Sequence, residues 1–146
     1  MKGRRLIQAS WIGTGLFVVT ATVGAIYPKV FALPAVVVAL ALFFAGLGVF
    51  AWSFATAVAR SRTDEISVAG LYLLSGSAPL REKVHLLGAL GVQVVVAFAT
   101  AGARINSSLA FGVLVPLFGL GMAGLWSARY GTFPSRPPDR RRLGTG

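Results

Sequence analysis

Four long apolar stretches constrain this chain more than any other feature. None of them contains Asp, Glu, Lys or Arg, and each is close to or above the roughly 20 residues that a helix needs to cross a bilayer. A barrel strand would alternate apolar with polar residues, and none of the four does so. The sequence therefore predicts an all-α integral membrane protein with four transmembrane helices. The predicted spans are residues 6–26, 34–58, 84–103 and 108–126.

The composition excludes several other classes of protein. Only 12% of the 146 residues are charged, whereas a soluble domain carries about 25%. The net charge of +10 comes from basic residues at the ends of the apolar stretches, a pattern typical of membrane topology rather than of nucleic-acid binding. The absence of cysteine excludes disulfides and thiol catalysis. We expect no nucleic-acid partner and no cofactor.

The distribution of Lys and Arg predicts the orientation. Of the 14 basic residues, all but Lys29 and Arg104 flank the spans on one side. Because cytoplasmic segments carry the excess of basic residues, both termini and residues 61–83 should be cytoplasmic. The first span could instead be a signal sequence cleaved near Ala25, but its apolar run exceeds the usual length of about 7–15 residues. We therefore expect an uncleaved, multi-pass protein of the cell inner membrane.

Short connections predict how the helices pair. Residues 27–33 and 104–107 are short enough to make antiparallel neighbours, so the first two spans and the last two should form two hairpins. The second span contains GLGVFAWS (46–53) and the fourth GLGMAGLWS (119–127). This similarity leaves open an internal duplication of one hairpin.

Residues 61–83, SRTDEISVAGLYLLSGSAPLREK, separate the two hairpins and hold most of the acidic residues. Thr63 can cap a helix, and the two acidic residues after it suit the positive end of a helix dipole. Gly76 suits the position just past the end of that helix. The pattern predicts a short cytoplasmic helix over residues 64–75 that lies in the headgroup layer or across the inner mouth of the bundle, with a re-entrant segment less favoured. Its apolar face comprises Ile66, Ala69, Leu73 and Leu74.

The domain formed by residues 1–126 is followed by a basic tail, residues 127–146. This tail is rich in Arg, Pro and Gly and poor in apolar residues, so it should be largely disordered. Its arginines either signal orientation or hold the tail to an anionic inner leaflet. The candidate lipid contacts are Arg136, Arg140, Arg141 and Arg142.

Two residues inside the predicted spans are candidates for a role beyond packing. Gln93 is the main polar residue at mid-span, and it can either hydrogen-bond a neighbouring helix or line a path for a polar substrate. Pro116 interrupts the fourth span, where it should produce a static kink or a hinge. Because the span interiors hold no ionisable side chain, the usual sign of proton-coupled transport is missing.

The candidates for catalysis are few. Asp64, Glu65, Glu82 and His85 lie in or beside residues 61–83, and one histidine with scattered carboxylates makes neither a convincing metal site nor a catalytic motif. We therefore expect no enzyme activity, with a lipid-modifying enzyme as the least favoured hypothesis.

The runs SRTDEISVAGLYLL and GLWSARYGTFPSRPP resemble small, uncharacterised four-span membrane proteins of actinobacteria. The resemblance implies a membrane location but brings no activity. Rows of small residues, such as Ala41 with Ala45 and Gly124 with Ala128, permit close packing within the bundle or against another subunit. The function that we expect is a non-enzymatic accessory or assembly subunit that binds a membrane protein or a second copy of itself. The alternative is a small oligomeric carrier or channel for a neutral or lipidic substrate.

Overall fold

The computed structural model describes residues 3–103, 106 and 108–137, and its described part is all-helical apart from one isolated bridge. Four helices are long and apolar enough to cross a membrane, the last of them spanning Ala110–Tyr130. The predictions of an all-α chain and of four such helices are confirmed. The elements in chain order are α1 (Arg4–Ile26), α2 (Pro28–Arg60), α3 (Val68–Tyr72), α4 (Leu80–Ala103), the 3-10 helix η1 (Ser108–Leu114) and α5 (Pro116–Tyr130).

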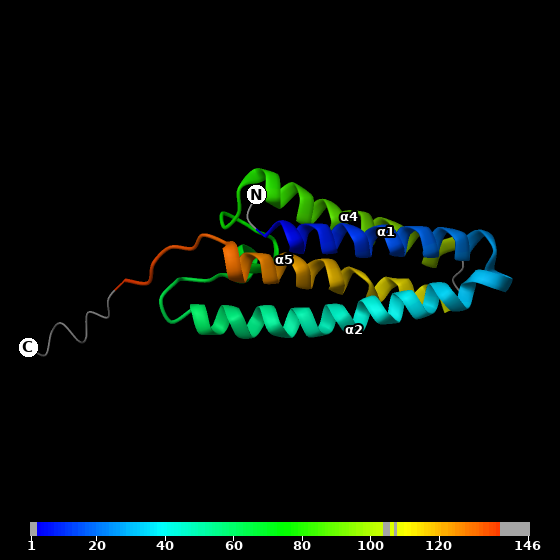
Figure 1. Ribbon diagram of the computed structural model, residues 1–146, viewed down its shortest axis with the longest axis horizontal. Helices are drawn as coiled ribbons and strands as arrows, with labels where there is room; N and C mark the ends of the chain where they lie inside the picture. Colours follow the sequence, from blue (N-terminus) through cyan, green and yellow to red (C-terminus); the bar gives the residue numbers. More distant parts are fainter. Residues whose placement is uncertain (1–2, 104–105, 107, 138–146) are drawn as a thin grey trace, which may run out of the picture.

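The long helices lie side by side, and α5 is the central one (Figure 1). It contacts α1, α2, α3 and α4. In the apolar 18-residue stretch of the span that ends in α5, 61% of the residues are buried, against 33% or less in the corresponding stretches of the other three spans. The start of α1, the segment between α2 and α4, and the end of α5 meet at one end of the bundle (Figure 1). We call this the loop end.

Glycines explain why α5 can occupy the centre. A Cβ atom on Gly46 of α2 would lie 2.6 Å from the Cα of Phe118, and one on Gly121 would lie 2.9 Å from the Gly46 carbonyl oxygen. These distances leave no room for a side chain, so the backbones of α2 and α5 are in direct contact. In lipid, where apolar burial drives helix association weakly, such close packing is a main source of stability.

Several predicted boundaries need correction. α2 begins at Pro28, ahead of the predicted start at residue 34, because Pro28 occupies the first helical position, where its missing N–H costs nothing. Pro34 therefore lies inside the helix, on its exposed side. α4 begins at Leu80 rather than residue 84, directly after Pro79. α5 continues past residue 126 to Tyr130.

Three apolar clusters of buried residues fill the interior, and the third of them joins α3 to the ends of α2 and α5. The first lies at mid-bundle and includes Phe17, Leu42 and Phe118. The second lies at the loop end, where Trp126 of α5 packs with Leu74 from the segment between α2 and α4. The second cluster ties that segment to the bundle.

The contact between α2 and α5 predicts a position-specific effect of a single methyl group. Gly46→Ala should lower the thermal stability of the purified protein in detergent, because the added methyl must push the two backbones apart, at a cost of about 1–3 kcal/mol. Gly48→Ala is the matched control, since a Cβ at Gly48 meets nothing within 4 Å. Equal unfolding temperatures for the two variants would contradict the close contact.

Candidate functional site at the loop end

The side chain of Gln93 on α4 is completely buried and bridges three helices. Its Nε2 donates to Thr14 Oγ1 of α1 at 2.7 Å, and its Oε1 accepts from the Gly119 amide of α5 at 3.1 Å. Both ends of the amide group are thus occupied within the protein. This geometry supports the packing role for Gln93 over that of a path-lining residue.

The break at Pro116 places the Gly119 amide in the first turn of α5, where backbone amides lack a partner within the helix and can donate to Gln93. Pro116 has no N–H, and the Gly112 carbonyl accepts instead from Val115 at 3.1 Å, a 3-10 contact. The chain changes there from η1 to α5, with Pro116 at the first helical position. The predicted kink thus takes the form of a junction between two kinds of helix.

The segment between α2 and α4 differs from its prediction. The helix α3 covers only Val68–Tyr72, and its N-cap is Ser67, whose Oγ accepts from the Gly70 amide at 3.0 Å. Asp64 is therefore not in the first turn of a helix, and the prediction of a helix over 64–75 is wrong at both ends. The helix stops early because Leu74 adopts a left-handed conformation, with φ of 55°. That conformation is unfavourable for leucine, and burial of the whole Leu74 side chain offsets it.

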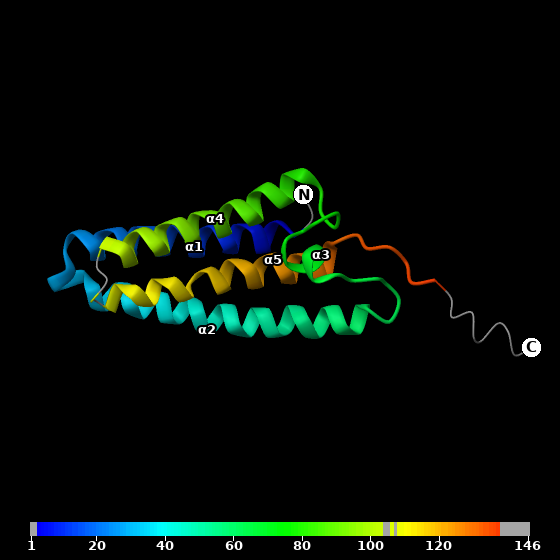
Figure 2. The same cartoon turned by 180° about the vertical axis from the view of Figure 1, so that it is seen from behind.

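The predicted apolar face of this segment also needs correction. Ala69 and Leu73 are exposed and Ile66 is half-buried, so only Leu74 of the predicted set is fully buried. Leu71 and Tyr72 turn inward instead. Figure 2 shows that α3 lies against the end of α5. The contact with α5 therefore determines which side chains of α3 are buried.

Tyr72 anchors α3 to the long helices. Its ring stacks on Phe50 of α2, with centroids 4.7 Å apart and planes within 9°. Its hydroxyl lies 3.4 Å from Ser53 Oγ, and its ring fills the space beside Gly124 of α5. A second contact joins Ser77 and Ser127, whose hydroxyl oxygens lie 3.1 Å apart and which both donate to the Gly70 carbonyl.

The chain after α5 folds back onto the same segment. The Glu65 amide donates to the Pro134 carbonyl, and the Arg136 amide donates to the Thr63 carbonyl, each at 2.8 Å. The Thr132 amide donates to the Ser77 carbonyl at 2.8 Å. We call residues 61–79 together with 131–137 the cap. The predicted tail boundary at residue 127 is therefore wrong, because residues 127–130 belong to α5 and residues 131–136 pair with the loop.

Arg60, at the end of α2, joins the two parts of the cap. Its Nε donates to Asp64 at 2.7 Å and its Nη1 to the Ala128 carbonyl at 3.3 Å. Its guanidinium carbon lies 5.1 Å from the ring centre of Phe133. The positive charge at the carbonyl end of α2 and α5 is electrostatically favourable. One residue thus connects α2, α5, the loop and the returning chain.

The other sequence candidates are dispersed. Glu82 is buried in the first turn of α4, and His85 meets the edge of Trp11, with ring centres 6.5 Å apart. Among the described residues no three His, Asp or Glu side chains are placed to hold a metal ion. The backbone of Arg136 is fixed by the bond to Thr63 and its side chain is exposed. Arg140, Arg141 and Arg142 lie outside the described residues.

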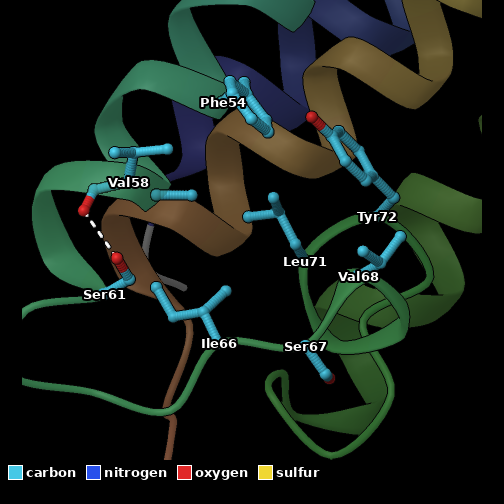
Figure 3. A pocket seen from close by; sticks show the side chains of 9 residues that line it. Phe54, Val58, Ser61, Ile66, Ser67, Val68, Leu71 and Tyr72 are labelled. Carbon is cyan, nitrogen blue, oxygen red and sulfur yellow. Dashed lines mark hydrogen bonds between the residues drawn. The ribbon is translucent and has the colours of Figure 1, made fainter.

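An apolar pocket of about 140 Å³ opens between α2 and the cap. Figure 3 shows Phe54 and Val58 of α2 facing Leu71 and Ile66 of the cap across it. Ser61, whose hydroxyl donates to the Val58 carbonyl at 2.7 Å, closes its edge. The pocket gives the cap a concave apolar surface beside the end of α2.

Comparison with protein-family models, curated proteins and solved structures finds no match for this chain. A functional proposal therefore depends on the geometry of the bundle and the cap. Sequence reasoning found Gln93 and Pro116 and located the loop end, but it missed Arg60 and Phe133. The contact between these two residues could not be predicted from sequence spacing, because 73 positions separate them along the chain. The aromatic residue within an otherwise polar tail was the only local signal.

The bridge made by Gln93 predicts a loss of stability on its removal. Gln93→Leu should destabilise the protein in detergent by about 1–2 kcal/mol, because the Thr14 and Gly119 groups lose their shared partner inside the bundle. Gln8→Leu makes the same substitution at an exposed position of α1 and should have little effect. A fully stable Gln93→Leu protein would show that the bridge contributes nothing.

The contacts of Arg60 predict that the cap loosens without it. In Arg60→Gln, the amides of Glu65, Thr132 and Arg136 should exchange with deuterium about tenfold faster, because the charged contacts that hold both chain segments are lost. Arg62→Gln removes an exposed charge two residues away and should leave exchange unchanged. Unaltered exchange in Arg60→Gln would mean that backbone bonds alone hold the cap.

Proposed function

We propose that this chain is a multi-pass protein of the cell inner membrane with both termini cytoplasmic. In this arrangement α1 with α2, and α4 with η1 and α5, form two membrane hairpins, and the cap lies at the cytoplasmic headgroup layer. The proposal is supported by four membrane-length apolar helices and by the meeting of α1, the loop and α5 at the end where most described basic residues lie. Lys29 lies at the opposite end, at the start of α2.

The function that the geometry supports best is a non-enzymatic accessory or assembly subunit that binds a membrane partner through its cap. The observation that carries this proposal is the ordered cap itself, in which backbone bonds and Arg60 fix two chain segments against the bundle. An ordered surface with exposed apolar residues is typical of an interaction site. The exposed apolar side chains at this end include Val68, Leu73 and Leu80.

The carrier or channel hypothesis draws less support from the bundle interior. It requires a polar surface along a path, and Gln93 is instead 0% exposed with both ends bonded to neighbouring helices. The hydroxyls of Thr14 and Thr100 also donate to carbonyl oxygens of their own helices. The polar groups of Gln93, Thr14 and Thr100 thus serve packing.

Photo-crosslinking in native membranes tests the role of the cap. A crosslinking amino acid at Val68 or Leu73 should yield one defined adduct, either with another membrane protein or with a second copy of the chain. Val30 and Leu33 are the matched controls, since they are similarly exposed and apolar but lie at the opposite end. Adducts from the control positions alone, or only lipid adducts from the cap, would contradict the proposal.

A further inference from the structure

A second opening at the loop end differs from the apolar pocket in its chemistry. It has a volume of about 540 Å³, within the range of about 300–1,000 Å³ that small-molecule sites occupy. Two arginines, one from the end of α2 and one from the end of α5, line it together with hydroxyl-bearing residues. The lining residues are Arg60, Asp64, Arg129, Tyr130, Thr132 and Phe133, together with Gly131.

The two arginines are not equivalent. Arg60 faces Asp64 at 2.7 Å and also binds the Ala128 carbonyl, so its charge is matched and its position fixed. Among the residues that the structure describes, this is the one ion pair, so Arg129 keeps an unmatched positive charge there. Arg129 is exposed, and its guanidinium carbon lies 5.8 Å from the ring centre of Trp52. A cation held over an aromatic ring is oriented but retains its hydrogen-bond donors.

Trp52 indicates the depth at which Arg129 lies. Its side chain is 60% exposed on the outer surface of α2, eight residues before Arg60, which is about 12 Å at the rise of an α-helix. Tryptophan prefers the boundary between hydrocarbon and headgroups. If the bundle sits in the membrane as proposed above, Arg129 is at the level of lipid phosphates.

We propose that the opening between the ends of α2 and α5 binds the phosphate of an anionic phospholipid of the inner leaflet, with Arg129 as its principal contact. The planar guanidinium donates to two phosphate oxygens, and the Thr132 and Tyr130 hydroxyls border the same opening. Trp52 lies beside the lipid's glycerol region and first methylene groups. Arg60 and Asp64 form the fixed wall of the site rather than its ligand. This inference depends on the proposed membrane location but not on a protein partner.

Native mass spectrometry of the full chain, released from neutral detergent with added phosphatidylglycerol, tests this site. Arg129→Gln should weaken retention of the lipid about tenfold, because a charge-assisted bidentate contact is lost. Arg129→Lys keeps the charge but not the planar fork and should weaken retention about threefold. Arg62→Gln is the control, since Arg62 is exposed at the same end but does not line the opening.

Each outcome of this experiment decides for or against the site. Equal losses in Arg129→Gln and Arg62→Gln would overturn the proposal in favour of diffuse attraction by a basic surface. Displacement of the lipid by millimolar inorganic phosphate would also overturn it, by assigning the opening to a soluble anion. Loss of lipid binding with retained crosslinking at Val68 would reject the lipid site alone. Retained lipid binding without a protein adduct would reject the accessory role alone.

Discussion

The direct backbone contact between α2 and α5 is the constraint on which the rest of the structure depends. Gly46 and Gly121 bring the two helices so close that neither position can carry a side chain. With α5 drawn to the centre, its remaining sides reach α1, α4 and α3. Phe118 then fits beside Gly13, and Tyr72 fits beside Gly124. If the bundle lies in a bilayer as proposed, where lipid provides little hydrophobic drive for helix association, these close contacts and the bonds of Gln93 hold the helices together.

The membrane-length helices could be predicted because their signal is local. Composition and length fix them, whatever the rest of the chain does. The exact ends of these helices were harder to predict. Either Pro28 or Pro34 could begin α2, and the turn at Tyr27 selects Pro28. The hydrogen-bond partners of Gln93 could not be predicted from the sequence, because Thr14 is 79 positions away in the chain. Sequence could show that Gln93 needs partners, but not which helices supply them.

The structure of the cap could not be predicted from residues close together in the sequence. Periodicity assigned the inward face of residues 64–75 from the residues of that segment alone, without its contacts to α5. The end of α5 determines the inward face instead, and it selects Leu71 and Tyr72. The polar composition of the tail indicated disorder, yet residues 131–136 are held by backbone hydrogen bonds that leave no mark in the side-chain composition. Both errors have one origin, the packing of two segments distant in the chain against each other.

The interior of the bundle and the loop end support different roles. Inside the bundle, Gln93 binds Thr14 and Gly119, and the Thr14 hydroxyl binds its own helix, and this is why the interior supports a structural role. At the loop end, Arg60 fixes a surface on which Leu73 and Val68 remain exposed and Arg129 faces outward. Recognition of a partner and of lipid is therefore expected at the cap.

The measurement that tests this account most directly is site-specific labelling with a soluble maleimide in native membrane vesicles. The chain contains no cysteine, so single substitutions give an unambiguous signal. Ser10→Cys probes the interior, because Ser10 is 0% exposed beside Thr14 and close in shape to cysteine, and Arg62→Cys probes the cap. The account predicts labelling of Arg62→Cys from the cytoplasmic side alone and no labelling of Ser10→Cys from either side. Labelling of Ser10→Cys in the folded protein would show a water-filled path through the bundle and contradict the account.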